Sequence, residues 1–202
     1  MKMKLLVAAA ATVVASSAMA QANPFEGFSA GVNVSAVGAS TQLNVPGQTI
    51  KFGEQSIVPS LEVGYMYGVT KEFALGVTAT YDLTNTNAGT FGPVQFKAKD
   101  HYSINLKPGY VFNNSSMVYA IVGYNSIKGE ASGAGFSQSQ NNSGIGVGLG
   151  LQFLVDKNIY IKAEAQQITF SSKNIQVTGI DTTGLSSKGS ATLGTIGIGY
   201  KF

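Results

Sequence analysis

From residue 28 to its C-terminus, the chain alternates apolar side chains with small or polar ones at a spacing of two residues. The clearest run is 144–153, in which the apolar positions are Ile145, Val147, Leu149, Leu151 and Phe153 and the positions between them are glycine or glutamine. A period of two places alternate side chains on opposite faces of a β-strand. Seven further strands are predicted at 28–36, 57–67, 73–82, 101–110, 117–125, 159–166 and 194–202.

One of these stretches has no clear polar face. Residues 117–125 are apolar at both odd and even positions, so the alternation does not say which side faces inward. No stretch after the first twenty residues has the 3.6-residue period of an amphipathic helix. The pattern therefore predicts an all-β chain, with the orientation of its fifth strand left open.

The connections between the predicted strands alternate in length. Segments 68–71, 113–116 and 156–158 are short, whereas 38–55, 84–97, 126–142 and 171–188 are long and rich in Gly, Ser, Thr and Asn. Bacterial outer-membrane barrels combine short periplasmic turns with longer outer loops, and aromatic residues at both membrane interfaces. We predict an eight-stranded antiparallel up-and-down transmembrane β-barrel; the alternative is a soluble β-sandwich.

The N-terminus has the form of an export signal. Lys2 and Lys4 precede an apolar run of about ten residues, and Ala18 and Ala20 flank Met19 as in a small-x-small cleavage site. A transmembrane anchor is the alternative, but about 20 apolar residues are needed to span a bilayer. We predict a cleaved signal peptide over 1–20 and a barrel domain over 21–202.

Composition excludes several classes of function. Charged residues make up 11% of the chain, against roughly 25% in soluble domains. The formal charge of +3 includes the two lysines of the leader, and arginine is absent, so the concentrated positive charge of a nucleic-acid site is missing. With one His and no Cys, we expect no cofactor and no metal site.

Several ionisable residues are predicted to point into the barrel. They are Glu62, Asp82, His101, Lys107, Lys162 and Glu164. An eight-stranded barrel is filled by side chains, and charges of both signs in its interior must be paired or solvated. We expect a network of ion pairs and hydrogen bonds that plugs the lumen; a gated path lined by the same groups is the alternative.

The C-terminal sequence and two internal stretches resemble a known family. These are 101–110 (HYSINLKPGY), 119–124 (YAIVGY) and the ending Tyr200-Lys201-Phe202. They are similar to the small outer-membrane β-barrel proteins of Gram-negative bacteria, the group of the OmpX, OmpW, OmpA-barrel and opacity-type proteins. The resemblance implies location in the cell outer membrane, contact with lipopolysaccharide, and an ending, carried by Tyr200 and Phe202, that the barrel assembly machinery recognises.

Function follows less directly from this resemblance. It implies a non-enzymatic protein with a structural or surface role in adhesion or resistance, carried by long outer loops that reach a host or surface ligand. A narrow channel for small apolar solutes is the alternative. A remote alternative is a lipid A acyl hydrolase, because His101 and Ser103 share a strand face in the His-x-Ser arrangement of that enzyme class.

Overall fold

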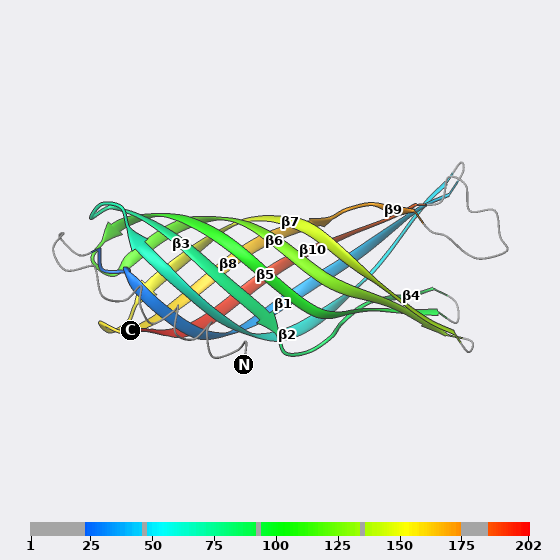
Figure 1. Ribbon diagram of the computed structural model, residues 1–202, viewed down its shortest axis with the longest axis horizontal. Helices are drawn as coiled ribbons and strands as arrows, with labels where there is room; N and C mark the ends of the chain where they lie inside the picture. Colours follow the sequence, from blue (N-terminus) through cyan, green and yellow to red (C-terminus); the bar gives the residue numbers. More distant parts are fainter. Residues whose placement is uncertain (1–22, 46–47, 92–93, 134–135, 175–185) are drawn as a thin grey trace, which may run out of the picture.

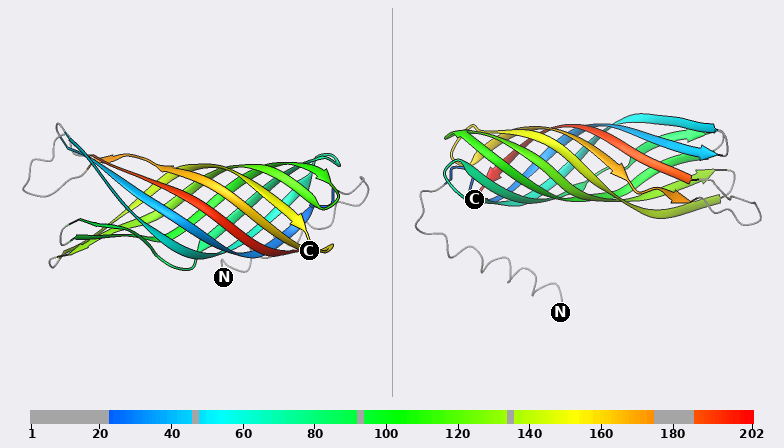
Figure 2. Two further views of the ribbon diagram at one scale, coloured as in Figure 1. Left: turned by 180° about the vertical axis from the view of Figure 1, so that it is seen from behind. Right: turned by 90° about the horizontal axis from the view of Figure 1, so that it is seen from above.

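The strands wind around a common axis and form a cylinder (Figures 1 and 2). The computed structural model describes residues 23–45, 48–91, 94–133, 136–174 and 186–202. Their strands are β1 (Gly27–Val45), β2 (Gln48–Gly68), β3 (Phe73–Asp82), β4 (Thr86–Phe91), β5 (Val94–Asn113), β6 (Ser116–Gly133), β7 (Phe136–Leu154), β8 (Ile159–Phe170), β9 (Lys173–Asn174) and β10 (Ser186–Lys201). Within these ranges, no helix has the length and apolar character needed to cross a membrane.

Eight strands close the barrel. Neighbours follow in the order β1, β2, β3, β5, β6, β7, β8, β10, and β10 pairs antiparallel with β1 from Ser29↔Lys201 to Asn44↔Ser186. Among the described residues, strand β4 pairs only with β5, and β9 adds two residues to the edge of β10. The predicted eight-stranded antiparallel up-and-down barrel is therefore confirmed, with two short accessory strands at one end.

The two faces of the wall differ as the alternation predicts. On β7, the outward side chains of Ile145, Val147 and Leu149 are 56%, 53% and 65% exposed. On the same level of the lumen, polar residues such as Asn105 of β5 are buried. An exposed apolar face with a buried polar interior is the reverse of a soluble β-sandwich, and it is the arrangement of a barrel in lipid.

The fifth predicted strand, which forms β6, faces inward with its odd-numbered residues. Met117, Tyr119 and Ile121 are buried, whereas Val118 and Val122 are exposed on the outer wall. Both faces are apolar because the inward one packs in an apolar cluster with Phe25, Ala74 and Val111. The sequence alone does not show which face of β6 points inward, because lipid on one side and this cluster on the other both favour apolar side chains.

The segments predicted as long loops are mostly strand. Residues of β1 and β2 remain paired up to Val45↔Gln48, and β6 and β7 up to Gly133↔Phe136. Between 84 and 97, β4 and β5 form another hairpin, whereas only the two ends of segment 171–188 lie among the described residues. The prediction of loops was wrong there because a hairpin solvated on both faces has no apolar face to mark it.

The hairpins leave the barrel in two groups. Strand β2 pairs with β3 only from Ser60 onward, and β7 pairs with β8 only from Gly144 onward. Beyond these points, pairing among the described residues joins β9, β10, β1 and β2 in one group and β4, β5, β6 and β7 in the other. Figure 1 shows the two groups diverging at the end of the molecule opposite the C-terminus.

The opposite end of the barrel is short and closed. Short turns join β2 to β3, β5 to β6 and β7 to β8 at this end, and the C-terminus lies here as well (Figure 1). Asn23 Nδ2 donates a hydrogen bond to the carbonyl oxygen of Thr70 at 2.9 Å, and Lys201 Nζ donates to that of Pro24 at 2.9 Å. These bonds hold the buried ring of Phe25 in the barrel end.

We expect a charge on the lipid face to destabilise the barrel according to its depth. Leu149→Lys, in the middle of the β7 wall, should lower the free energy of unfolding by about 2–4 kcal/mol, because a lysine at the bilayer midplane loses its hydration. Val155→Lys, in the turn after β7, is the matched control and should cost about 0–1 kcal/mol. Urea titration in phospholipid vesicles measures both, and equal losses would contradict the assigned membrane depth.

Candidate functional site

Four charged side chains meet in the lumen. Lys107 Nζ lies 3.0 Å from Glu62 Oε2 and 2.7 Å from Glu164 Oε1, and Lys162 Nζ lies 2.6 Å from Glu62 Oε1 and 3.3 Å from Glu164 Oε1. Each lysine thus contacts both glutamates, and each glutamate contacts both lysines. We call these four residues the charge tetrad.

The tetrad draws its members from three parts of the wall. Glu62 comes from β2, Lys107 from β5, and Lys162 and Glu164 from successive inward positions of β8. Their side chains are between 2% and 12% exposed, so each charge depends on its partners rather than on bulk water. Buried ion pairs of this kind cost much desolvation, and removing one member leaves an uncompensated charge.

A tyrosine completes the group. Tyr119 of β6 donates its hydroxyl to Glu164 Oε1 at 2.7 Å, and its ring lies 5.4 Å from Lys107 Nζ. The ring occupies the space in front of Gly150 on β7, where a Cβ atom would collide with it. Gly199 on β10 makes room for the ring of Tyr160 in the same way. Glycine on one strand thus permits a large inward side chain on the next.

The other two predicted lumen residues form a separate group. His101 Nδ1 lies 2.7 Å from Asp82 Oδ2, and His101 Nε2 lies 3.1 Å from Asn125 Oδ1. The six residues expected to form one network are therefore divided into the tetrad and this histidine group. Asn125 and Tyr119 were not predicted, because the apolar character of 117–125 on both faces concealed its inward residues.

The arrangement around Ser103 does not match an acyl hydrolase. Its hydroxyl accepts a hydrogen bond from Asn105 Nδ2 at 3.0 Å and is buried in the lumen. Both ring nitrogens of His101 are engaged by Asp82 and Asn125. A serine nucleophile requires a base within hydrogen-bond reach, and an acyl chain would have to enter the lumen to meet it. The hydrolase alternative therefore lacks the contact on which its chemistry depends.

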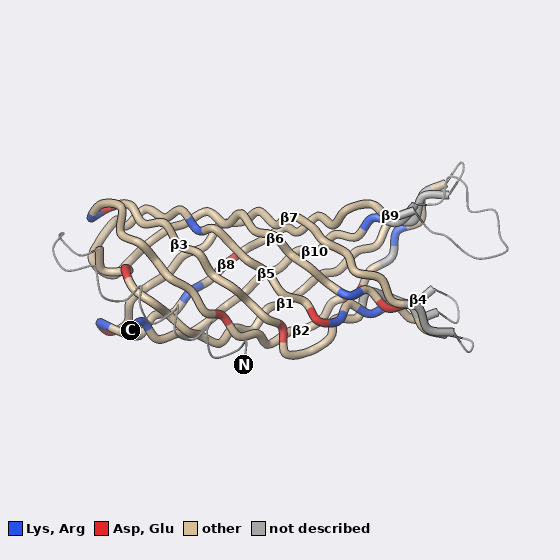
Figure 3. Tube along the Cα trace, viewed as in Figure 1, with Lys and Arg blue, Asp and Glu red and all other residues tan. Residues whose placement is uncertain are grey.

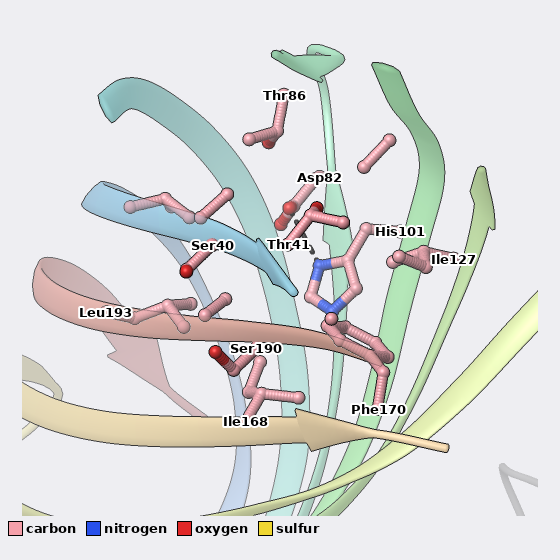
Figure 4. Close-up of a pocket in the computed structure, with 15 residues that line it drawn as sticks. Ser40, Thr41, Asp82, Thr86, His101, Ile127, Ile168, Phe170, Ser190 and Leu193 are labelled. Carbon is pink, nitrogen blue, oxygen red and sulfur yellow. Dashed lines mark hydrogen bonds and ion pairs between the residues drawn. The ribbon is translucent and has the colours of Figure 1, made fainter. Parts of the chain in front are cut away.

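A small cavity lies in the lumen above the histidine group, toward the hairpins. Its volume is about 90 Å³, equal to the liquid volume of about three water molecules. Apolar side chains of β1, β8 and β10 form much of its wall, including Val37, Ile168 and Leu193. Figure 4 shows His101 and Asp82 at one side of this space and Phe170 beneath the imidazole.

An apolar layer separates this cavity from the tetrad on the β1 and β8 side. Val37, Val58, Ile168, Phe170 and Ala191 pack together as one buried cluster. On the other side of the tetrad, toward the short turns, lies the cluster that contains Phe25 and Met117. The lumen thus has apolar packing near both ends and charges between them.

Of the sites predicted near the two termini, the structure describes the C-terminal one and not the cleavage site. Tyr200 and Phe202 point outward, 47% and 74% exposed, with ring centroids 5.1 Å apart. Both rings are therefore accessible from the membrane at the short-turn end. Ala18 and Ala20, predicted to flank the cleavage site, lie outside the described residues.

Comparison with known families agrees with this architecture. The family model described as "outer membrane protein beta-barrel domain" matches residues 6–202. The chain belongs to this family. This outer-membrane β-barrel accordingly resides in the outer membrane of a Gram-negative cell, as predicted.

Several solved structures are similar to this outer-membrane β-barrel at low sequence identity. Neisserial surface protein A is 18% identical, with 87% of this chain and 97% of that chain covered and a TM-score of 0.54. The attachment invasion locus protein Ail of Yersinia pestis is 20% identical, with 88% and 99% covered and a TM-score of 0.46. The outer-membrane protease OmpT of Escherichia coli is 10% identical, with 88% and 97% covered and a TM-score of 0.49. No curated protein sequence matches significantly.

We expect the tetrad to respond to a single charge deletion and to tolerate a balanced one. Lys162→Met leaves two glutamates with Lys107 alone and should lower the free energy of unfolding by about 3–5 kcal/mol. Lys162→Met with Glu62→Met keeps the 2.7 Å Lys107–Glu164 pair and should recover most of that loss.

Urea titration in vesicles, followed by circular dichroism, measures these differences. Lys71→Met, in an exposed turn, controls for the loss of a lysine and should leave stability unchanged. Equal destabilisation by the single and double variants would show that charge balance is not what holds the tetrad together.

Proposed function

We propose that this outer-membrane β-barrel is a non-enzymatic and non-conducting scaffold that holds long β-hairpins above the membrane for contact with a host or surface ligand. Strand length carries the proposal. A tilted strand crosses the bilayer with about 9–11 residues. Strands β1, β2 and β5 have 19, 21 and 20 residues. Roughly half of each strand therefore extends past the membrane, and it does so at the hairpin end.

The lumen supports the non-conducting part of the proposal. The tetrad joins opposite parts of the wall by contacts of 2.6–3.3 Å, and apolar clusters pack on either side of it. An ion would have to displace a paired charge of the tetrad to pass through the lumen. We therefore assign the functional surface to the hairpins rather than to the interior.

Paired strands make the hairpins suitable for a binding role. Because β1 and β2 stay in register up to Val45↔Gln48, their side chains keep fixed positions relative to one another. Surface contacts on a rigid support bind with less loss of conformational entropy than contacts on a flexible loop. This property favours a specific contact over a purely structural role.

Shortening the hairpins tests the surface role. Residues 41–52 of β1 and β2, and 131–138 of β6 and β7, can each be replaced by Asn-Gly, which suits a two-residue hairpin turn. Equal numbers of residues leave both strands, so the register of the barrel is kept. We expect the shortened protein to fold and insert, as judged by heat-modifiable gel mobility.

Bacteria producing the shortened protein should adhere less to epithelial cells, or survive less in serum, than bacteria producing the full chain. Cells that carry the empty vector set the baseline for both measurements. The surface role would be refuted if the full-length and shortened proteins gave the same adherence and survival. Discrete single-channel currents from the purified full-length protein in planar bilayers would refute the non-conducting role.

The lumenal cavity favours a second candidate, the binding of small apolar solutes. Val37, Ile168 and Leu193 give it an apolar wall near the outer mouth, and Asp82 and Thr86 add a polar side. Gly189 also lines it, and the three atoms nearest to a Cβ atom there all belong to the Phe170 side chain, at ordinary contact distances of 3.5–3.9 Å. The site is therefore open to a filling substitution that needs no change in the backbone.

Gly189→Leu should abolish saturable binding of xenon, measured by methyl chemical shifts of the protein in nanodiscs, because leucine occupies the cavity. Gly194→Leu is the matched control, since no atom lies within 4 Å of a Cβ at this position of the same strand. Gly194→Leu should bind xenon as the unaltered chain does. If the unaltered chain shows no saturable shifts, or Gly189→Leu retains them, the cavity is not a solute site.

A further inference from the structure

Three lysines and a glutamate gather on the outside of the β5–β6 hairpin. They are Lys97 and Lys99 of β5 and Lys128 and Glu130 of β6, and we call them the lysine patch. In the register of the two strands, Lys97 lies opposite Glu130 and Lys99 lies opposite Lys128. All four therefore occupy one face of the hairpin, within two rows of residues.

The patch faces away from the lumen. Ala98 and Ile127 line the lumenal cavity, and they are the sequence neighbours of the lysines. Successive side chains of a strand point to opposite faces, so Lys97, Lys99 and Lys128 lie on the outer surface. Lys128 is exposed, and Lys99 retains 31% of its side-chain accessibility.

The patch lies just beyond the membrane-spanning part of the wall. Tyr81, Tyr102 and Tyr124 are outward-facing and 45–49% exposed on the neighbouring strands β3, β5 and β6. Tyrosines in such a row mark the interface between hydrocarbon and headgroups. The Tyr102↔Ser126 pair is followed, after a bulge, by Lys99↔Lys128. The lysines thus reach the level of the lipid headgroups.

Negative charge within the patch is insufficient for its lysines. Lys99 Nζ lies 2.8 Å from both carboxylate oxygens of Glu130. Hydrogen bonds from Lys99, with added attraction to Lys97 and Lys128, hold the pKa of the Glu130 carboxyl below its usual range. One carboxylate therefore serves three ammonium groups, and Lys99 faces the like charge of Lys128 directly across the strands, which is unfavourable without an anion.

The bulge beside the patch contributes a second acid. Asp100 is exposed and has a φ of 50°, a left-handed conformation that Asp and Asn tolerate. Its carboxylate reduces the net positive charge of this region but does not cancel it. Figure 3 shows the basic and acidic positions gathered near β4, while most of the barrel wall carries no charge.

We propose that the lysine patch binds the phosphate groups of lipopolysaccharide in the outer leaflet. Lys97 and Lys128 contact the phosphates. The ion pair between Lys99 and Glu130 keeps these two lysines in place. The height of the patch matches that of a lipid headgroup, and its excess positive charge matches a phosphorylated one. The site does not depend on the proposed surface role of the hairpin tips, so either can fail alone.

Two matched double variants test the proposal. Lys97→Gln with Lys128→Gln removes the two patch lysines that form no ion pair among the described residues and leaves the Lys99–Glu130 pair, so the hairpin should fold as before. Lys51→Gln with Lys188→Gln removes the same charge from the other group of hairpins, where both residues lie opposite Gln42. Heat-modifiable mobility confirms folding of each variant.

Binding is measured by native mass spectrometry of the protein in phosphatidylcholine nanodiscs titrated with lipopolysaccharide. Loss of Lys97 and Lys128 should weaken binding about 30-fold, whereas the Lys51 and Lys188 variant should bind within about threefold of the unaltered chain. Asp100→Asn, which keeps the bulge and removes a carboxylate, should bind a few-fold more tightly. Dephosphorylated lipid A should not distinguish the variants.

Three results would overturn the proposal. Equal weakening in the two double variants would mean that affinity follows total charge rather than this patch. Equal affinity for phosphorylated and dephosphorylated lipid A would mean that phosphate is not the ligand. Unchanged lipopolysaccharide binding with lost heparin binding in the Lys97 and Lys128 variant would assign the patch to a sulfated polysaccharide.

Discussion

Lipid offers no hydrogen bonds to a peptide group, and this constraint determines the architecture. Each amide within the bilayer must find its partner in a neighbouring strand, so the sheet has to close on itself. The pairing of β1 with β10 meets this requirement along the whole membrane-spanning wall. Above the membrane, water satisfies free backbone groups, and there the pairing of β2 with β3 and of β7 with β8 stops. The change from closed barrel to separate hairpins thus coincides with a change of solvent.

The same constraint fixes the character of the interior. Because the outer face must be apolar, polar residues occupy the lumen, where they have to satisfy one another. The charge tetrad does so with four contacts between two lysines and two glutamates. Its role in sealing the barrel and the exposure of the hairpins are two parts of one proposal, since a closed interior leaves the outer surface as the place for recognition.

Much of the fold follows from the sequence because lipid imposes a strict period of two. The alternation from Ile145 to Phe153 is unambiguous since every second residue faces hydrocarbon. The hairpin ends of β1 and β2 were not recognisable, because water on both faces selects no side-chain period. The alternation of side chains predicts that Glu62 and Lys107 point inward. Their pairing with Lys162 and Glu164 depends on the register between strands, which the alternation does not give. The alternation also does not identify Tyr119 as an inward residue, because its strand is apolar on both faces.

In the lumen, a glycine on one strand leaves room for a large ring on the next. Gly150 lies against the Tyr119 ring, and Gly199 lies against the Tyr160 ring. A methyl group added at either glycine would displace an aromatic ring, and replacing either tyrosine with a smaller residue would leave a cavity. Sequence divergence at these sites therefore has to proceed by concerted exchange, in which one position grows as its neighbour shrinks. Correlated variation of such small and large partners among relatives would record the register of this wall.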